Sequence, residues 1–497
     1  MARSGADLNH ILPATEDWIP SGDKAKVRAN LDAIKLLKQL EAENRNATPE
    51  EKQVLARYTG WGGLKEIFDE GKAAYRERPP WSDEQKREAA NWEKSWGKLY
   101  DEAKATMTPE EHDAAARSIL NAHYTSRDVI KAVWNGALRL GFKGGNALEP
   151  AGGVGHFLGL TPEAVRAKTN WRAVELDSVS GRILAKLYPQ AHVQNMGFQE
   201  SRIPANSQDL VISNVPFAAD GPMDKRYPRM SLHNYFFARG LDLLKPGGIM
   251  AAITSDSTMD GGAASRKARE YLADRADLVG AIRLPNTAFK KNAGTEVTTD
   301  ILFFRKKDGT PFAGSDFKRT VPAETYKGEP IEINEYFASH PEMMLGRMSK
   351  EGTMYRGEQQ ALLPTPGADL NRQMEEAVAK LPENVMGSAA APAAPASAPI
   401  AEKGSKLGGL VLKNDVPHIV AADGTLERPE WAGDARKVTQ AKSYLGVRDL
   451  ARDNIAMQLD PNMGDEAIAN HRAKLNKAYD EYFKKYGAIN EQIRVSR

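Results

Sequence analysis

The residues at 214–217, Asn-Val-Pro-Phe, follow an apolar run and carry side chains that are poor choices for packing alone. The run itself, 210–212, is typical of a buried strand. Pro216 has no backbone N–H to donate, so it ends pairing on one side of that strand. A side-chain amide and an aromatic ring at a strand's carboxyl end suit a binding site. For an isolated motif, the alternatives are a turn residue for Asn214 and a partly buried core aromatic for Phe217.

A second candidate site is the glycine-rich stretch 148–157, LEPAGGVGHF. It follows a predicted strand and opens towards a helix. The Gly-Lys-Ser/Thr of a P-loop is missing here and elsewhere in the sequence, which disfavours nucleotide hydrolysis. Glu149 and Pro150 precede the glycines, and a carboxylate at that point would repel a pyrophosphate but would pair with an ammonium group. This favours S-adenosylmethionine (SAM), which has an amino-acid end and no phosphate, over a dinucleotide.

The end of the next predicted strand carries Glu175, which is placed to accept two hydrogen bonds from ribose hydroxyls. A glycine loop alone is weak evidence, because a generic turn between a strand and a helix has the same composition. Its glycines let a backbone pass close to a ligand, and together with Glu175 they favour a SAM site.

The elements that must position these residues alternate along the chain from 121 to 307. Helical segments separate most of the apolar runs, which indicates an α/β fold with a parallel sheet. The last two runs lie close together and could form an antiparallel hairpin that completes the sheet. The predicted strands are 146–150, 171–177, 191–195, 209–214, 247–255, 278–285 and 298–306.

The flanking regions differ in pattern from this central segment. Residues 1–120 are charged and helix-patterned, and TPEE at Thr48 and again at Thr108 reads as a helix start. Beyond the central segment we expect three parts. The first is a mixed extension at 308–386, a candidate for DNA contact. An Ala/Pro-rich linker follows at 387–405, and then a short β piece with a helical hairpin at 406–497.

The composition restricts the possible functions. The 497 residues allow roughly three domains. Lys plus Arg number 68 against 66 Asp plus Glu, so any nucleic-acid surface must be local. The sequence has no cysteine, which excludes disulfides, thiolate metal sites and cysteine nucleophiles. We see no metal site, no signal peptide and no membrane span, and we expect a soluble cytoplasmic protein.

Three motifs together resemble the N6-adenine DNA methyltransferase family: EPAGGVGHF (149–157), SNVPF (213–217) and LLKPGG (243–248). Their order is that of the γ-type enzymes and the type I modification subunits. More closely, YTGWGGL, NVPF and AIRLPNTAF…GTEVTTDILFF resemble the methylase portion of large plasmid and phage methylase–helicase proteins. The resemblance covers about residues 45–307. The helicase motifs of the longer proteins are absent, so we expect a stand-alone methylase.

The resemblance implies a Rossmann-like SAM-dependent methyltransferase sheet, with a helical N-terminal region and a small helical C-terminal region. It also implies SAM as cofactor, DNA as partner and an adenine flipped out of the duplex. Asn214 Oδ1 and the carbonyl of Val215 would accept the two N6–H bonds of adenine, Pro216 would shape the turn, and Phe217 would stack on the base. Val215 stands where the family has proline; it supplies the same carbonyl with less fixed geometry.

The resemblance also implies cofactor contacts. AHYTSRDVI (122–130) resembles the segment whose backbone and threonine touch the methionine end of SAM. Gly197 occupies the position of an acidic residue that contacts the SAM adenine, and Asn195 or Gln199 would have to substitute. Phe236 matches an aromatic that packs on that adenine, with core packing as the alternative. The cofactor-binding candidates are Tyr124, Thr125, Glu149, Pro150, Ala151, Gly152, Gly153, Gly155, Phe157, Glu175, Phe198 and Phe236.

Phosphate contacts are expected in the loop directly after Phe217. The candidates are Lys225, Arg226, Tyr227 and Arg229, with Lys290, Lys291 and Lys306 as weaker ones; a solvated charged surface is the alternative. None of the flanking regions carries a recognisable reading motif, so we expect a short or relaxed target. A specificity partner and a homodimer both stay open.

Two other functions stay open. One is methylation of RNA adenine or of a protein glutamine, since related methyltransferases that act on each of these substrates have a similar Asn-Pro-Pro-Tyr motif. The other is a non-catalytic DNA-binding or anti-restriction accessory with a decayed methylase fold, which Val215 and Gly197 would favour.

Overall fold

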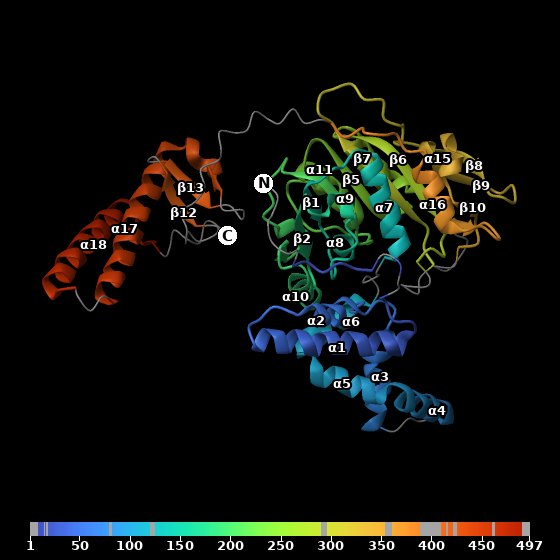
Figure 1. The fold of residues 1–497 in the computed structure, drawn as a ribbon, viewed down its shortest axis with the longest axis horizontal. Coiled ribbons are helices and arrows are strands. Elements are labelled where there is room, and N and C mark those ends of the chain that lie inside the picture. The colour runs from blue at the N-terminus through green and yellow to red at the C-terminus, as the bar shows by residue number, and fades with distance from the viewer. Residues whose placement is uncertain are drawn as a thin grey trace. The chain divides into compact units, whose positions relative to one another are not determined.

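The protein is described by a computed structural model, drawn in Figure 1. The residues described are 8–13, 15, 18–78, 82–119, 125–289, 296–352, 360–387, 409–413, 416–420, 425–459 and 463–489. The chain divides into two compact units, 1–389 and 390–497. Each unit is described by itself.

The first unit is built on a seven-stranded sheet with the order β3-β2-β1-β4-β5-β7-β6. The five strands β1 to β5 run parallel, whereas β7 is antiparallel to both β5 and β6. The carboxyl ends of β1, β2 and β4 therefore lie at one edge, and the strand order reverses between β1 and β4, where this kind of sheet binds ligands. The strands are β1 Gly145–Glu149, β2 Thr169–Glu175, β3 His192–Asn195, β4 Gln208–Asn214, β5 Leu244–Ser255, β6 Ala276–Leu284 and β7 Thr299–Lys306.

Helices cover both faces of this sheet, and glycines show which helix covers which face. Met250 pairs with Phe304 on one face. A side chain on Gly240 of α11 would press on Met250, whereas one on Gly136 of α7 would collide with Phe303 on the other face. Adjacent strand residues point to opposite faces, so α7 and α11 lie on opposite sides. The helices are α7 Arg127–Arg139, α8 His156–Gly159, α9 Glu163–Arg166, α10 Ser178–Leu187, α11 Leu232–Leu243, α12 Ser257–Asp260 and α13 Ala263–Ala273.

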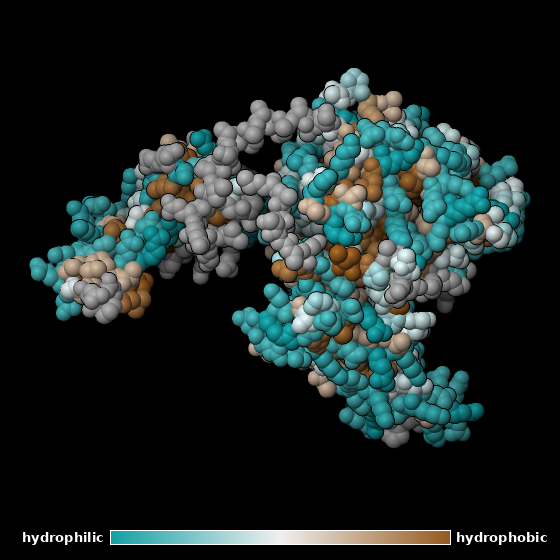
Figure 2. Space-filling view, in the orientation of Figure 1, coloured by the Kyte–Doolittle hydropathy of each residue, from teal (hydrophilic) through white to brown (hydrophobic). Residues whose placement is uncertain are grey.

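The N-terminal helices pack beside the sheet in the same unit. Thr48 and Thr108 both form complete capping boxes, as the TPEE motifs predict. Arg182 of α10 pairs with Glu41 and Glu111, which ties these helices to the sheet domain. Figure 2 shows the α4 end of this region as almost entirely hydrophilic. The helices are α1 Asp23–Ala42, α2 Pro49–Ala56, α3 Glu70–Ala73, α4 Asp83–Trp92, α5 Lys98–Thr106 and α6 Pro109–Ser118.

The extension beyond β7 also belongs to the first unit. Its Leu362 accepts a hydrogen bond from the backbone N–H of Asn286 at 2.8 Å and donates one to Thr298 Oγ1 at 2.9 Å. Both partners lie in the connection between β6 and β7, so the extension is joined to the carboxyl edge of the sheet. Its elements are β8 Thr320–Glu324, β9 Pro330–Asn334, α15 Glu335–Ser339, β10 Gly346–Ser349, β11 Ala361–Pro364 and α16 Leu370–Val378.

The second unit contains a small antiparallel sheet and a pair of helices. In α18, Tyr482 is buried and Tyr479 is 39% exposed. The elements are β12 Leu410–Lys413, β13 Val416–Val420, β14 Leu426–Glu427, α17 Ala435–Leu459 and α18 Asp465–Tyr486. Most of the expected linker at 387–405 lies outside the described residues. Across the described parts of both units, no helix has the length and apolar character needed to cross a membrane.

Candidate active site

Asn214 is the last residue of β4, a central strand held between β1 and β5. Its Nδ2 donates a hydrogen bond to Thr125 Oγ1 at 2.9 Å. Its Oδ1 is buried and has no hydrogen-bond partner. A buried acceptor without a donor is costly, and Oδ1 is therefore available to accept a hydrogen bond.

The residues after Asn214 turn the chain away from the sheet. The backbone N–H of Val215 still donates to the Ile253 carbonyl at 3.1 Å, and its side chain is buried. Pro216 and Phe217 are only partly buried, and the Phe217 ring packs against the edge of the core. The ring is thus supported from behind and keeps accessible surface, which a stacking platform requires.

The glycine loop follows β1 and is shaped by its own backbone. Gly153 and Gly155 have φ values of 52° and 83°, in the region that only glycine adopts freely. A side chain on Gly155 would also collide with Leu184 and Tyr188, which pack beneath the loop. The Gly153 N–H donates to Glu175 Oε2 at 2.7 Å, so the ends of β1 and β2 are linked across the loop.

Two carboxyl groups face this loop. Burial raises the pKa of Glu149 well above its usual range, and the neighbouring Glu175 adds to the effect. Burial likewise raises the pKa of Glu175 to about 7, against hydrogen bonds from the backbone of Asp177 and Gly153. Glu149 Oε2 is buried without a partner. A pair of poorly solvated carboxylates attracts a cation, so the site fits the ammonium group of an amino acid.

Part of the hydrogen-bonding capacity of Glu175, which we expect to bind a ribose, is already used within the protein. Its two oxygens already accept the N–H groups of Gly153 and Asp177, each at 2.7 Å. Each carboxylate oxygen has a second lone pair, so room for two ribose hydroxyls remains.

Leu176 was missed by the sequence analysis. It follows Glu175 directly and its side chain is 76% exposed, although leucine is normally buried. An exposed apolar side chain at this edge offers a surface for a planar ring. Leu176 falls inside the predicted strand 171–177, so its exposure was not predictable from the pattern, although it directly follows the candidate binding residue Glu175.

The expected adenine contacts lie in a packed aromatic cluster. Phe198 and Phe236 are both buried, with ring centroids 4.9 Å apart. The amide of Gln199 lies where a side chain on Gly197 would begin. Asn195 instead donates to the carbonyls of Glu175 and Asp177. Of the two substitutes considered for the missing acidic residue, Gln199 is the one whose side chain lies beside Gly197.

The other residues expected to bind the cofactor are buried in the core or contact neighbouring residues of the protein. Phe157 is buried in the core, and its carbonyl accepts a hydrogen bond from Trp134 Nε1 at 3.1 Å. Pro150 is buried and Ala151 packs against the core. Thr125 is 5% exposed and contacts Asn214, while Tyr124 lies outside the described residues.

The loop after Phe217 separates the expected DNA contacts into two kinds. Lys225 and Arg229 are exposed, and Arg229 forms an ion pair at 3.4 Å with the equally exposed Asp220. Arg226 forms an ion pair with the buried side chain of Asp224, and the Tyr227 hydroxyl donates to Asp242 at 2.8 Å. Those two side chains hold the loop against α11, which leaves the exposed pair as the better phosphate candidates.

The remaining lysines do not strengthen the predicted DNA surface. Lys306 ends β7, which runs antiparallel to β5, and its Nζ donates to the Leu244 carbonyl at 2.8 Å. It therefore lies at the edge opposite Asn214, and the expectation that it contacts DNA beside the site is wrong. Lys290 and Lys291 lie outside the described residues.

A buried histidine at the start of α11 was also missed. His233 Nε2 lies 2.9 Å from Ser231 Oγ and 3.2 Å from Ser257 Oγ, while its Nδ1 is buried without a partner. Burial lowers the pKa of His233 to about 4, so the ring is neutral at pH 7. This side chain joins α11 to the end of β5, next to Ser255.

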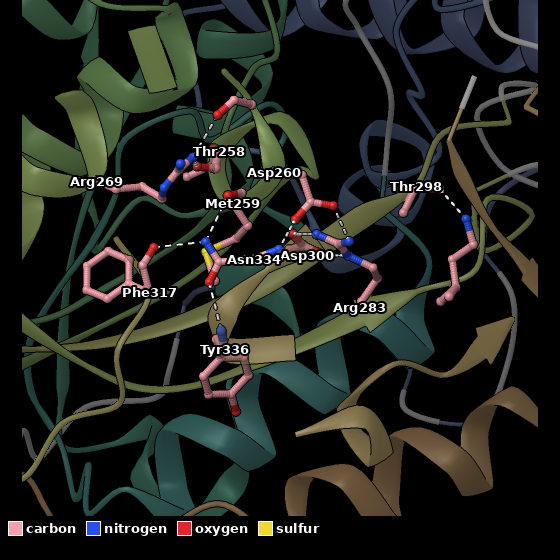
Figure 3. Close-up of polar contacts among 12 residues, drawn as sticks. Thr258, Met259, Asp260, Arg269, Arg283, Thr298, Asp300, Phe317, Asn334 and Tyr336 are labelled. Atoms are coloured by element: carbon pink, nitrogen blue, oxygen red, sulfur yellow. Dashed lines mark hydrogen bonds and ion pairs between the residues drawn. The ribbon is translucent and has the colours of Figure 1, made fainter. Parts of the chain in front are cut away.

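An ion network stabilises the neighbouring strands (Figure 3). Arg283 of β6 is fully buried and bonds both oxygens of Asp300 on β7 at 2.8 Å. It also reaches Asp260, whose other oxygen accepts the backbone N–H of Asn334 at 2.9 Å. The network fastens the extension to α12 and β6.

The sheet order and the ligand-binding edge define the class: the fold is that of the class I SAM-dependent methyltransferases, as expected. Residues 185–289 match the model of the Eco57I restriction-modification methylase family, which confirms the expected similarity to restriction-modification methylases. The chain is also 30% identical, over 292 residues, to "Defense against restriction protein B" of Escherichia phage P1. The match covers 58% of this chain and 10% of that protein, so the chain spans about a tenth of the relative's length.

Solved structures with similar folds include two methyltransferases. The M protein of the type I restriction enzyme EcoKI is 16% identical, with a TM-score of 0.35 over 70% of this chain and 86% of that one. A class I SAM-dependent methyltransferase from Listeria monocytogenes is 17% identical, with a TM-score of 0.36 over 59% of this chain and 91% of that one.

Proposed function

We propose that the protein is a SAM-dependent DNA methyltransferase that acts on the N6 amino group of adenine. The observation that carries the proposal is the buried, unpartnered Oδ1 of Asn214 at the carboxyl end of β4. It lies at the same sheet edge as Glu149 and Glu175, whose carboxyl groups suit a cationic cofactor. The match of residues 185–289 to a restriction-modification methylase supports DNA as the substrate.

The residues of this chain would hold the cofactor from two sides. Glu149 would pair with the ammonium group, and Glu175 would accept ribose hydroxyls. Leu176 and Gln199 would face the adenine ring of the cofactor, one through an apolar surface and the other through hydrogen bonds. When bound, SAM supplies a methyl group on a positively charged sulfur.

The target base would be held by the chain around Asn214. Asn214 Oδ1 and the Val215 carbonyl each accept one N6–H of the flipped adenine. This orients the nitrogen lone pair towards the donor, so catalysis is mainly a positioning effect. Phe217 stacks on the base, a contact worth about 1–3 kcal/mol. Lys225 and Arg229 contact phosphates beside the flipped nucleotide.

The test is incubation of the full chain with labelled SAM and unmethylated duplex DNA, followed by digestion and nucleoside analysis. We expect N6-methyladenine from the wild type and a loss of about 100-fold or more with Asn214→Ala. Label that appears only in RNA or in protein glutamine would replace the DNA assignment. No transfer to any substrate, together with no SAM binding, would support a non-catalytic accessory.

A further inference from the structure

The hydrogen bond from Asn214 to Thr125 joins residues that are 89 positions apart in the chain. Nδ2 donates to Thr125 Oγ1 at 2.9 Å, and Thr125 is only 5% exposed. Water therefore competes poorly for this contact. The bond uses the donor end of the amide and leaves the acceptor end, Oδ1, buried and free.

The direction of this amide decides what Asn214 can bind. A carboxamide has nearly the same shape at both ends, and a half-turn exchanges its oxygen and its NH₂ group. With Oδ1 towards the substrate, the amide accepts an N–H from an amino group. With Nδ2 there, two donors would face each other, and the amino group would be repelled. Binding of an amino substrate therefore requires the Asn214 side chain to be held with Nδ2 bonded elsewhere and Oδ1 left available.

The backbone around Thr125 is well placed to fix it. Ser126 caps α7, its Oγ accepting the Val129 N–H at 3.4 Å. That helix is held in the core by several buried side chains, including Trp134. Thr125 thus lies one residue before a rigid helix start. On the other side, Asn214 pairs with Ile253 of β5, so both partners of the bond are on fixed supports.

We infer that Thr125 is the positioning residue for Asn214: its hydroxyl accepts from Nδ2 and so holds the side chain in place, with Oδ1 left for the amino group to be methylated. This rests on the proposed function and adds a role to Thr125, which the family resemblance assigns to the cofactor. A hydroxyl has two lone pairs and one proton, so contact with the cofactor and with Asn214 are compatible. The two roles differ in what a variant loses.

The experiment compares Thr125→Val with Thr125→Ser in the full chain. Valine keeps the shape of threonine and removes the acceptor, whereas serine keeps it. We expect Thr125→Val to lower kcat at saturating SAM by about 10-fold to 100-fold, with the SAM Kd unchanged within about twofold. Thr125→Ser should restore most of the rate. The matched control is Thr169→Val, a similarly buried threonine at the opposite edge, which should keep the wild-type rate.

A second measurement follows the amide itself. With ¹⁵N-asparagine labelling, the Asn214 side-chain resonance is assigned by its loss in Asn214→Ala. Exchange of its NH₂ protons with solvent should become about fivefold faster in Thr125→Val and stay slow in Thr125→Ser. Unchanged exchange would overturn the inference, and so would a rise in SAM Kd with kcat intact. If the wild type methylates no DNA while exchange responds as expected, the proposed function fails and the hydrogen bond stands.

Discussion

The pH dependence of the carboxyl pair gives the sharpest prediction. Burial raises the pKa of Glu175 from 4.5 to about 7 in the folded protein without cofactor. Between these values the folded state keeps a proton that the unfolded state has lost. Stability is therefore fully present below pH 4.5 and falls as pH rises to 7. A shift of this size corresponds to about 3 kcal/mol.

Cofactor binding should depend on pH in the opposite sense. An ammonium group is attracted by ionised carboxylates, and ribose hydroxyls donate best to them. We therefore expect SAM affinity to rise by up to about tenfold per pH unit between pH 5 and 7, as Glu175 ionises. The free energy of unfolding and the SAM affinity should change in opposite directions over the same range.

The assay combines urea unfolding without SAM and calorimetric titration with SAM, each at several pH values. Glu175→Gln should reduce the pH dependence of both the free energy of unfolding and the SAM affinity. Asp256→Asn is the matched control, because burial also raises the pKa of Asp256 to about 7, yet this residue has no assigned cofactor contact. It should flatten only the unfolding profile. Equal SAM affinity at pH 5.5 and pH 8 in the wild type would refute the reasoning.

Three further predictions concern the base platform, the ion network and the DNA surface. Phe217→Ala should weaken binding of the flipped base by about 1–3 kcal/mol, measured on DNA with an abasic opposite strand, and leave SAM affinity unchanged. Arg283→Leu should lower the free energy of unfolding in urea by about 3–5 kcal/mol, because Asp300 is left buried and unpaired; a smaller effect than Arg266→Leu on the surface would contradict this. Replacing Lys225 and Arg229 by Gln should lower the salt slope of DNA binding by about two; an unchanged slope would remove both from the interface.

The sequence was sufficient for those parts of the fold that depend on local patterns. Apolar runs located the strands, and the paired TPEE motifs identified two capped helices. The predicted strand 171–177 ends at Glu175 in the structure, which places Leu176 beyond the sheet and exposes it. Strand ends are poorly determined by pattern, since the residues that follow a strand need not differ in type.

Charge patterns were less informative than apolar ones. Lys225, Arg226 and Arg229 look equivalent in sequence, yet Arg226 pairs with the buried Asp224, Arg229 pairs with the exposed Asp220, and Lys225 has no ion pair among the described residues. The location of Lys306 could not be predicted from the charge pattern either, because only the antiparallel direction of β7 decides which edge of the sheet this residue reaches. The partners of a charged side chain depend on contacts between segments that are far apart in the sequence.

The contacts that assemble the site are of this long-range kind. Asn214 ends a strand, Thr125 precedes a helix, and no periodicity relates them, but a hydrogen bond joins their side chains. The same edge carries Thr298, which receives the extension through Leu362. Both segments that flank the sheet in sequence therefore end on the edge where the candidate site lies. This explains why the four residues 214–217, read alone, left the turn and core alternatives open: the hydrogen-bond partner of the Asn214 side chain lies 89 positions away in the chain.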